Sequence, residues 1–256
     1  MKSKKLKKWT TLLTCATALT VMTACSQSSS QSTGTSTSSK TSAVTATTSK
    51  KTNKNNSNYF TSKDSDTSYN ESSATKIKLS GSSADVSGDG AVLSGSTVTI
   101  SKAGTYVISG KSDGVQIKVD AGDSDDVHIV LDGVTMTNTN AAINATKAGH
   151  VYLTLKDGTT NTLSDSSSNS DQDADAVIFS KGDLTINGSG TLNIDAKKNN
   201  GIKANDSLHM TGGTYKISSV GDAFNVNDEL NITGTTMTIE AEEDGVKVDN
   251  DDDTSV

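Results

Sequence analysis

From Lys76 onward the chain alternates apolar and polar positions in short runs. Residues 77–79, 98–100, 106–108 and 115–119 are examples, and Gly, Asp and Ser separate them. Alternation with a period of two is the pattern of β-strands, and these separating residues favour tight turns. No window carries an apolar stripe with the 3.6-residue period of an amphipathic helix. The pattern predicts an all-β protein without a substantial helix.

A seven-residue sequence motif recurs in the second half of the chain at a constant interval. Residues 200–206 read NGIKAND, residues 222–228 read DAFNVND and residues 244–250 read DGVKVDN, so each copy follows the last by 22 residues. A fixed period in this range is typical of a solenoid. Each interval holds three strand-like triplets, which predicts a three-faced parallel β-helix with about 22 residues per coil.

The triplets are apolar at their ends and mostly polar in the middle. Strand side chains alternate between faces, so the ends are expected to point inward and the middle outward. Equivalent residues of successive coils should stack about 4.8 Å apart. Two interior rows are expected: Ile202, Phe224 and Val246 in one, and Leu184, Leu208 and Leu230 in the other.

The two ends of this region carry their own expectations. Residues 76–110 are predicted to cover the N-terminal end of the solenoid, because an uncovered end would expose core and unpaired strand edges. At the other end, the sequence stops one strand into a coil. We therefore expect a domain at 76–256 that is truncated at its C-terminus.

The first 75 residues have a different composition. Five lysines within the first eight residues precede a short apolar stretch, which is typical of an export signal at 1–24. That signal ends in VMTAC, which resembles a bacterial lipobox and predicts lipidation of Cys25. Residues 25–75 are rich in Ser, Thr, Lys and Asn and are expected to form a disordered linker. The predicted location is the extracellular face of the bacterial membrane, with a lipid anchor.

Charge narrows the choice of partners. The formal net charge is -7, and all 23 basic residues are lysine, without arginine. Phosphate recognition relies on basic patches and on forked arginine contacts, so a nucleic-acid partner is not expected. Polycations, divalent metals or neutral polymers are the more natural partners of this acidic chain.

Acidic and amide residues align at the corner before each repeated triplet. Asp175, Asn200, Asp222 and Asp244 stack there, with Asp173, Glu242 and Glu243 nearby. Calcium takes six to eight oxygen ligands and tolerates irregular geometry, so the corner is a candidate Ca²⁺ site. The alternative is that Asp, Asn and Gly simply form tight turns.

Other side chains suggest contacts with sugars. Lys203, Asn225 and Lys247 form one outward row, and Tyr152 offers a ring for stacking. The alternative is a solvated face with no ligand. The three histidines have no partner at a zinc-like spacing, and no nucleophilic-serine motif is present, so neither a zinc site nor a serine hydrolase is expected.

Two sequence segments resemble those of a known family. Residues 101–110 (SKAGTYVISG) and 126–135 (DVHIVLDGVT), together with the later repeats, resemble a bacterial family of carbohydrate-binding domain-containing surface proteins. The resemblance implies a right-handed parallel β-helix similar to pectate lyases. It also implies calcium along the helix and binding of cellulose or acidic sugars.

Three functions remain open. The first is a lipid-anchored, calcium-stabilised module that binds polysaccharide without cleaving it. The second is a calcium-dependent polysaccharide lyase; similar enzymes commonly use arginine as the base, so Lys203 or Lys247 would have to replace it. The third is an adhesin that binds protein.

Overall fold

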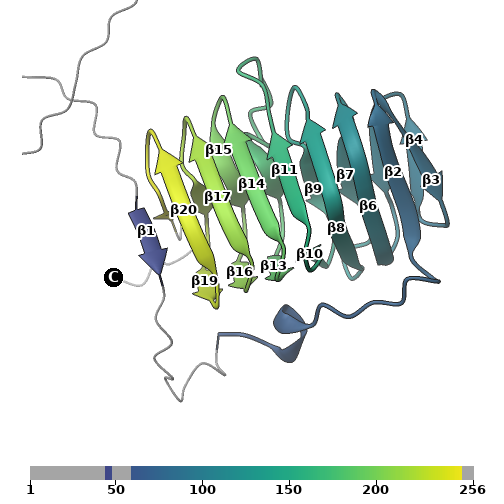
Figure 1. Ribbon diagram of the computed structural model, residues 1–256, viewed down its shortest axis with the longest axis horizontal. Coiled ribbons are helices and arrows are strands. Elements are labelled where there is room, and N and C mark those ends of the chain that lie inside the picture. Colours follow the sequence, from purple (N-terminus) through teal and green to yellow (C-terminus); the bar gives the residue numbers. More distant parts are fainter. Residues whose placement is uncertain (1–43, 48–58, 250–256) are drawn as a thin grey trace, which may run out of the picture. The chain divides into compact units, whose positions relative to one another are not determined.

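A computed structural model describes residues 44–47 and 59–249 (Figure 1). Within these ranges the chain is almost entirely β-structure, and the helical element is the short 3-10 turn η2 (Ser62–Ser65). The predicted signal peptide, Cys25, and most of the predicted linker lie outside the described residues. No helix in the described part of the chain is long and apolar enough to cross a membrane.

Most strands belong to three ladders in which neighbours run parallel. The first ladder, in spatial order, contains β5 (Thr97–Ile100), β7 (Gln116–Asp120), β9 (Ile143–Lys147), β12 (Ala176–Ser180), β15 (Asn200–Ala204), β18 (Phe224–Val226) and β21 (Lys247–Val248). The second ladder contains β10 (His150–Leu155), β13 (Leu184–Gly188), β16 (Leu208–Thr211) and β19 (Leu230–Thr233). The third contains β11 (Thr160–Ser164), β14 (Thr191–Ala196), β17 (Thr214–Ser219) and β20 (Thr236–Ala241).

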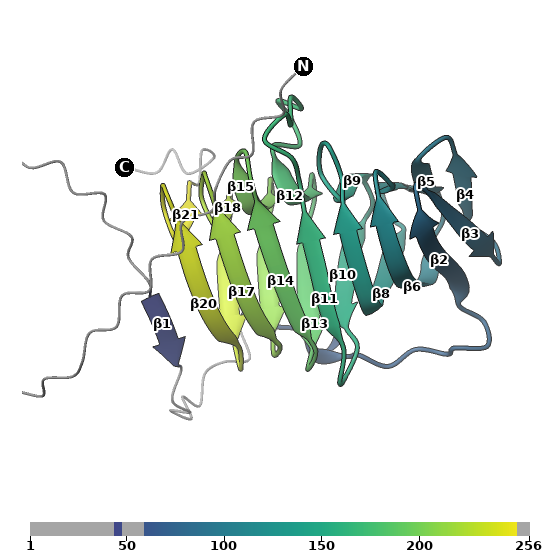
Figure 2. The ribbon, with the colours of Figure 1, turned by 45° about the horizontal axis from the view of Figure 1, so that its top comes forward.

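Long strands join the second and third ladders. The first half of β8 (Asp126–Thr137) pairs with β10, and its second half pairs with β11. β6 (Gly104–Asp113) and β2 (Thr75–Gly81) continue the same parallel sheet beyond β8. Figure 2 shows the strands following one another in chain order along this sheet.

Two hairpins close the N-terminal end, where we expected a covering. β3 (Ser83–Ser87) pairs antiparallel with β2, and β4 (Ala91–Ser94) pairs antiparallel with β5. At the other end β1 (Val44–Thr47) pairs antiparallel with β20. The predicted all-β class and the parallel stacking of strands are both confirmed.

The register shows how far the repeat extends. Ile202 pairs with Phe224 and Leu208 pairs with Leu230, each 22 residues later. One coil earlier the interval is longer, since Leu184 pairs with Leu208. The pairing of Val151 with Leu184 spans the insertion at 164–173. A single interval of 22 residues therefore holds only for the last coils.

Inward positions of the three ladders form one continuous apolar core. Ile202, Phe224 and Leu208 are each fully buried, as the two predicted rows require. Val246 departs from its predicted place in the first row, because its side chain is 49% exposed at the end of the ladder. Aliphatic rows of this kind are stabilised by about 25 cal/mol per Å² of apolar surface removed from water.

A column of glycines turns the chain between the second and third ladders. Gly188, Gly212 and Gly234 all have positive φ, at +99°, +91° and +66°. A Cβ atom on Gly212 would lie 2.6 Å from the carbonyl oxygen of Gly188 in the previous coil. Both the backbone conformation and the close approach of the coils therefore require glycine at this corner.

Part of the predicted linker is packed on the sheet. We call residues 59–72 the strap. Within it Asp64 is buried, and its side chain accepts a hydrogen bond from Thr185 of β13. The abundance of Ser, Thr and Lys predicted disorder for this segment, but specific polar contacts with β13 and β16 order its described part.

We expect Gly212→Ala to lower stability by about 1–3 kcal/mol, because alanine rarely adopts this φ and its methyl group would clash with Gly188. Gly182→Ala is the matched control, since φ there is not positive and a Cβ atom would meet its nearest neighbours at 3.7 Å. Thermal unfolding followed by circular dichroism measures both variants. Equal midpoints for Gly212→Ala and Gly182→Ala would contradict the close packing of this corner.

Candidate functional site

A hollow of about 260 Å³ lies at the corner that leads into the strands of the first ladder. Its walls come from the turns before β18 and β21, the start of β15, and the outward side chains of β18 and β21. The residues of interest on its wall are Asp175, Asn200, Asp222, Asn225, Glu243 and Lys247. Predicted metal ligands and predicted sugar contacts thus meet at one place, which we call the corner site.

Hydrogen bonds link three of the predicted corner residues from coil to coil. The Asn200 side-chain oxygen accepts a bond from the backbone N–H of Asp222 at 2.9 Å. The Asp222 carboxylate accepts the equivalent bond from the backbone N–H of Asp244 at 3.1 Å. Each side chain therefore satisfies the turn of the next coil, which is the turn-forming role expected of Asp and Asn.

The carboxylates of Asp175 and Asp222 also accept hydrogen bonds from side-chain amines and amides. Asp175 accepts a hydrogen bond from the Lys203 amine at 2.7 Å, and both side chains are largely buried. The second carboxylate oxygen of Asp222 accepts from the Asn225 amide at 2.7 Å. These contacts hold Lys203 and Asn225 in fixed orientations beside the hollow.

The predicted outward row is present. Lys203 pairs with Asn225, and Asn225 pairs with Lys247, so the three side chains occupy equivalent positions on β15, β18 and β21. The Lys247 amine lies 3.1 Å from Asp249. The hydrogen bond with Asp249, and the negative charges of Asp249 and Asp222, raise the pKa of Lys247. Lys247 is therefore a cation at neutral pH.

Several predicted metal ligands do not line the hollow. Asp244 contributes its backbone N–H to Asp222, and Glu242 is outside the wall. Asp173 belongs to the preceding turn, where its backbone N–H donates to Asp171. Within residues 59–249 no three His, Cys, Asp or Glu side chains converge closely enough to hold a metal ion.

Tyr152 lies apart from this row, on the outward face of β10. Its ring stacks on His150 with centroids 4.1 Å apart, and the Lys63 amine of the strap lies 4.6 Å from the centroid of the tyrosine ring. Only 9% of Tyr152 is exposed. As a sugar platform, Tyr152 is therefore covered by the chain itself.

The histidines are more enclosed than surface residues. His128 Nε2 is 2.8 Å from the Thr154 hydroxyl, and His150 Nε2 is 2.9 Å from the Thr185 hydroxyl. Burial lowers the pKa of both His128 and His150. The sequence pattern of these strands contains no signal that the strap covers this face.

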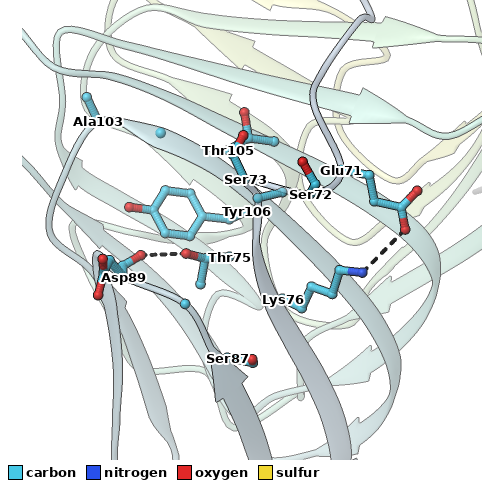
Figure 3. Close-up of a pocket in the computed structure, with 13 residues that line it drawn as sticks. Glu71, Ser72, Ser73, Thr75, Lys76, Ser87, Asp89, Ala103, Thr105 and Tyr106 are labelled. Carbon is cyan, nitrogen blue, oxygen red and sulfur yellow. Dashed lines mark hydrogen bonds and ion pairs between the residues drawn. The ribbon is translucent and has the colours of Figure 1, made fainter.

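A larger hollow, of about 570 Å³, lies at the N-terminal end of the sheet (Figure 3). Two contacts within the fold are drawn there: Glu71 pairs with Lys76, and the Thr75 hydroxyl donates to the Asp89 carbonyl. The Tyr106 hydroxyl donates to the carbonyl of Lys102 at 2.7 Å. This arrangement supports the hairpins at that end and offers less converging chemistry than the corner site.

A family model and a curated relative that match this chain carry the same description. Residues 94–256 match the sequence model of a family described as carbohydrate-binding domain-containing protein. A protein of that description from Acetivibrio thermocellus is 37% identical over 137 residues, which cover 51% of this chain and 48% of the relative. The chain thus aligns with about half the length of this relative.

A solved structure gives a second comparison. It is described as the polysaccharide lyase-like protein from C. thermocellum, gadolinium derivative, and it superposes with a TM-score of 0.58. The sequence identity is 25%, and the match covers 68% of this chain and 94% of the solved chain.

We expect Asp222→Ala to lower stability by about 1–3 kcal/mol in the presence of a chelator, because the Asp244 N–H and the Asn225 amide lose their acceptor. Asp222→Asn keeps one side-chain oxygen, as Asn200 does one coil earlier, and should retain most of the stability. Thermal unfolding measures both variants. Equal loss in the two variants would contradict the hydrogen-bonding role of this side chain.

Proposed function

The chain belongs to the family of carbohydrate-binding domain-containing proteins, and we propose that it binds polysaccharide at the corner site without cleaving it. The observation that carries this proposal is the meeting of Asn225 and Lys247 with Asn200 and Asp222 around one hollow. Amides and ammonium groups donate hydrogen bonds to sugar hydroxyl and carboxylate oxygens. The site therefore suits an extended glycan that carries both.

The row on the first ladder supports binding to a linear polymer. Lys203, Asn225 and Lys247 repeat at the spacing of hydrogen-bonded strands, about 4.8 Å. Lys247 is a cation at one end of the row, so a chain with carboxylates would gain a charge-assisted hydrogen bond there. The Lys203 ammonium group at the other end already pairs with Asp175. An acidic polysaccharide is accordingly our preferred ligand, with a cellulose-like glycan as the neutral alternative.

Calcium forms a further part of this proposal. Asp175, Asp222, Glu243 and the Asn200 carbonyl would supply oxygen ligands, with Asp173, Asp244 and Glu242 available from the adjoining turns. The contacts of Lys203 with Asp175 and of Asn225 with Asp222 would have to open to free these oxygens. Gadolinium, present in the solved relative, is a hard cation with the same preference for oxygen ligands as calcium.

The second candidate is a lyase, and the likeness to a polysaccharide lyase-like protein favours it. Such a reaction needs a base that removes the proton next to a uronate carboxylate. The raised pKa of Lys247 opposes that role, since a general base must be unprotonated. The Lys203 amine is engaged by Asp175. We therefore favour binding over cleavage.

The N-terminal sequence completes the proposal. An export signal at 1–24, lipidation of Cys25 and a polar linker would place the domain on the outer face of a bacterial membrane. We also infer that the three ladders wind as a right-handed β-helix, because parallel crossover connections are right-handed in about 98% of cases.

We expect the full chain to retain oligogalacturonate without releasing unsaturated products, which absorb in the ultraviolet. Asn225→Ala should weaken retention about tenfold, since one well-placed hydrogen bond is worth about 1.4 kcal/mol. Thr238→Ala, on the third ladder, is the matched control and should bind normally. Unsaturated product would establish the lyase instead, and failure to bind a panel of acidic and neutral glycans would favour the adhesin.

We expect calcium to raise the thermal midpoint of the native sequence. Asp222→Asn, which keeps the turn hydrogen bond but loses the charge, should abolish most of that increase. A ligand stabilises a fold by about 2.7 kcal/mol at a hundred times its dissociation constant, so the increase is measurable. The same increase in Asp222→Asn as in the native sequence would exclude Asp222 as a calcium ligand.

A further inference from the structure

The outward face of the second ladder carries an unusual row of side chains. His128, Tyr152, Thr185 and His209 occupy equivalent positions on β8, β10, β13 and β16. Aromatic rings and hydroxyl groups are side chains that can pack against a ligand and hydrogen-bond to it. We call this surface the strap face, because residues 59–72 lie over it.

A parallel row of hydrogen-bonding groups runs beside the first. Thr154, Asn187 and Thr211 pair in register on β10, β13 and β16. Thr154 is 2% exposed, and Asn187 and Thr185 are fully buried, although all three point away from the core. Their burial therefore comes from the strap.

The strap meets these rows mainly through oxygen atoms. The Asp64 carbonyl accepts hydrogen bonds from the Thr211 hydroxyl at 2.5 Å and the Asn187 amide at 3.2 Å. The Asn187 amide also donates to the Asp66 carbonyl at 3.1 Å. The Asp64 carboxylate accepts from the Thr185 hydroxyl at 2.7 Å. A carboxylate and two carbonyl oxygens thus occupy the donors of the strap face.

The Asp64 carboxylate is buried yet stabilised as an anion. Burial acts to raise its pKa, but hydrogen bonds from Thr185 and Thr61 outweigh that effect and hold the pKa below its ordinary value. The His209 ring lies between two acids, with Nδ1 3.3 Å from Asp64 and Nε2 3.5 Å from Glu229. The strap face therefore accepts a carboxylate at this position.

The aromatic contacts of the strap are peripheral to these hydrogen bonds. Phe60 meets His209 edge-on at 5.6 Å, and Tyr69 meets His128 edge-on at 6.1 Å. Lys63 lies over Tyr152 and pairs with the exposed Asp126. Each hydrogen bond within a protein makes a net contribution to stability of only about 1 kcal/mol. A ligand that supplies the same acceptor oxygens can therefore compete with the strap.

The family match separates the face from its cover. It begins at residue 94, so β8, β10, β13 and β16 lie within the shared region and the strap lies before it. The strap face is thus part of the region that the family model describes, and the strap lies outside that region.

We propose that the strap face is a second glycan-binding surface, and that the strap occupies it as an internal competitor. The ligand is an acidic polysaccharide: a uronate carboxylate takes the place of Asp64, sugar hydroxyl oxygens take the places of the two carbonyls, and a ring packs on Tyr152. This inference rests on the proposed function for its class of ligand, but it concerns a separate surface.

The test uses the full chain with Asn225→Ala and Lys247→Ala, which remove the corner site from the measurement. Into this background we introduce Asp64→Ala and measure the binding of fluorescent oligogalacturonate. Freeing the face should tighten binding about tenfold or more, because apparent affinity scales with the fraction of competent protein. Ser62→Ala, an exposed strap position without a side-chain contact to the face, is the matched control and should give no gain.

Two further measurements make the result decisive. Adding Thr185→Val to the protein that carries Asp64→Ala should remove the gain in binding. Hydrogen exchange should show that residues 60–66 lose protection in Asp64→Ala but not in the Ser62→Ala control. Freed strap without added binding would overturn the proposal. A strap that stays protected would overturn it as well, because the Asp64 carboxylate, whose place the uronate is proposed to take, would then not hold the strap on the face. Binding of a synthetic 59–72 peptide but not of oligogalacturonate would make the face a peptide site. Loss of the corner site affects none of these outcomes.

Discussion

Parallel register is the constraint on which the rest of the structure depends. Each strand obtains its hydrogen-bond partners from the coils before and after it, so no coil is complete alone. The same register places equivalent side chains at one strand spacing, about 4.8 Å, over the length of each ladder. Leu184, Leu208 and Leu230 become a core row by this means. Lys203, Asn225 and Lys247 become a binding row for the same geometric reason.

Features that repeat along the chain could be predicted from its sequence. The alternation of apolar and polar residues located the triplets around Ile202 and Phe224, and the interval between them located the turn carrying Asp222. Side-chain direction in a strand depends only on position, so the outward row was predictable as well. The sequence also indicated that Asp and Asn would form turns, and the hydrogen bonds of Asn200 and Asp222 are of that kind.

Features that depend on contacts between distant segments could not be predicted in this way. The strap has the composition of a linker, and its order comes from Asp64 meeting Thr185, 121 residues away. Tyr152 was expected to be an open platform because nothing in its own strand indicates a cover. Asp173 and Glu242 were assigned to the corner site by proximity in sequence, and neither residue lines the hollow. The local sequence pattern determines to which face of the sheet a side chain points. It does not determine which distant segment packs over that face.

The corner ladder has one amide among its acids, and this has an electrostatic consequence. Asn200 separates Asp175 from Asp222, so these two charges are two strand spacings apart, about 10 Å, which is close to the screening length at physiological ionic strength. Asp222 and Asp244 have no such spacer, and Lys247 lies beside them. Adjacent acids therefore meet at one step of this column only, between the last two coils, and the Lys247 cation offsets their repulsion there. The joining of the last two coils therefore depends on Lys247, whereas the coils before them rely on an amide spacer.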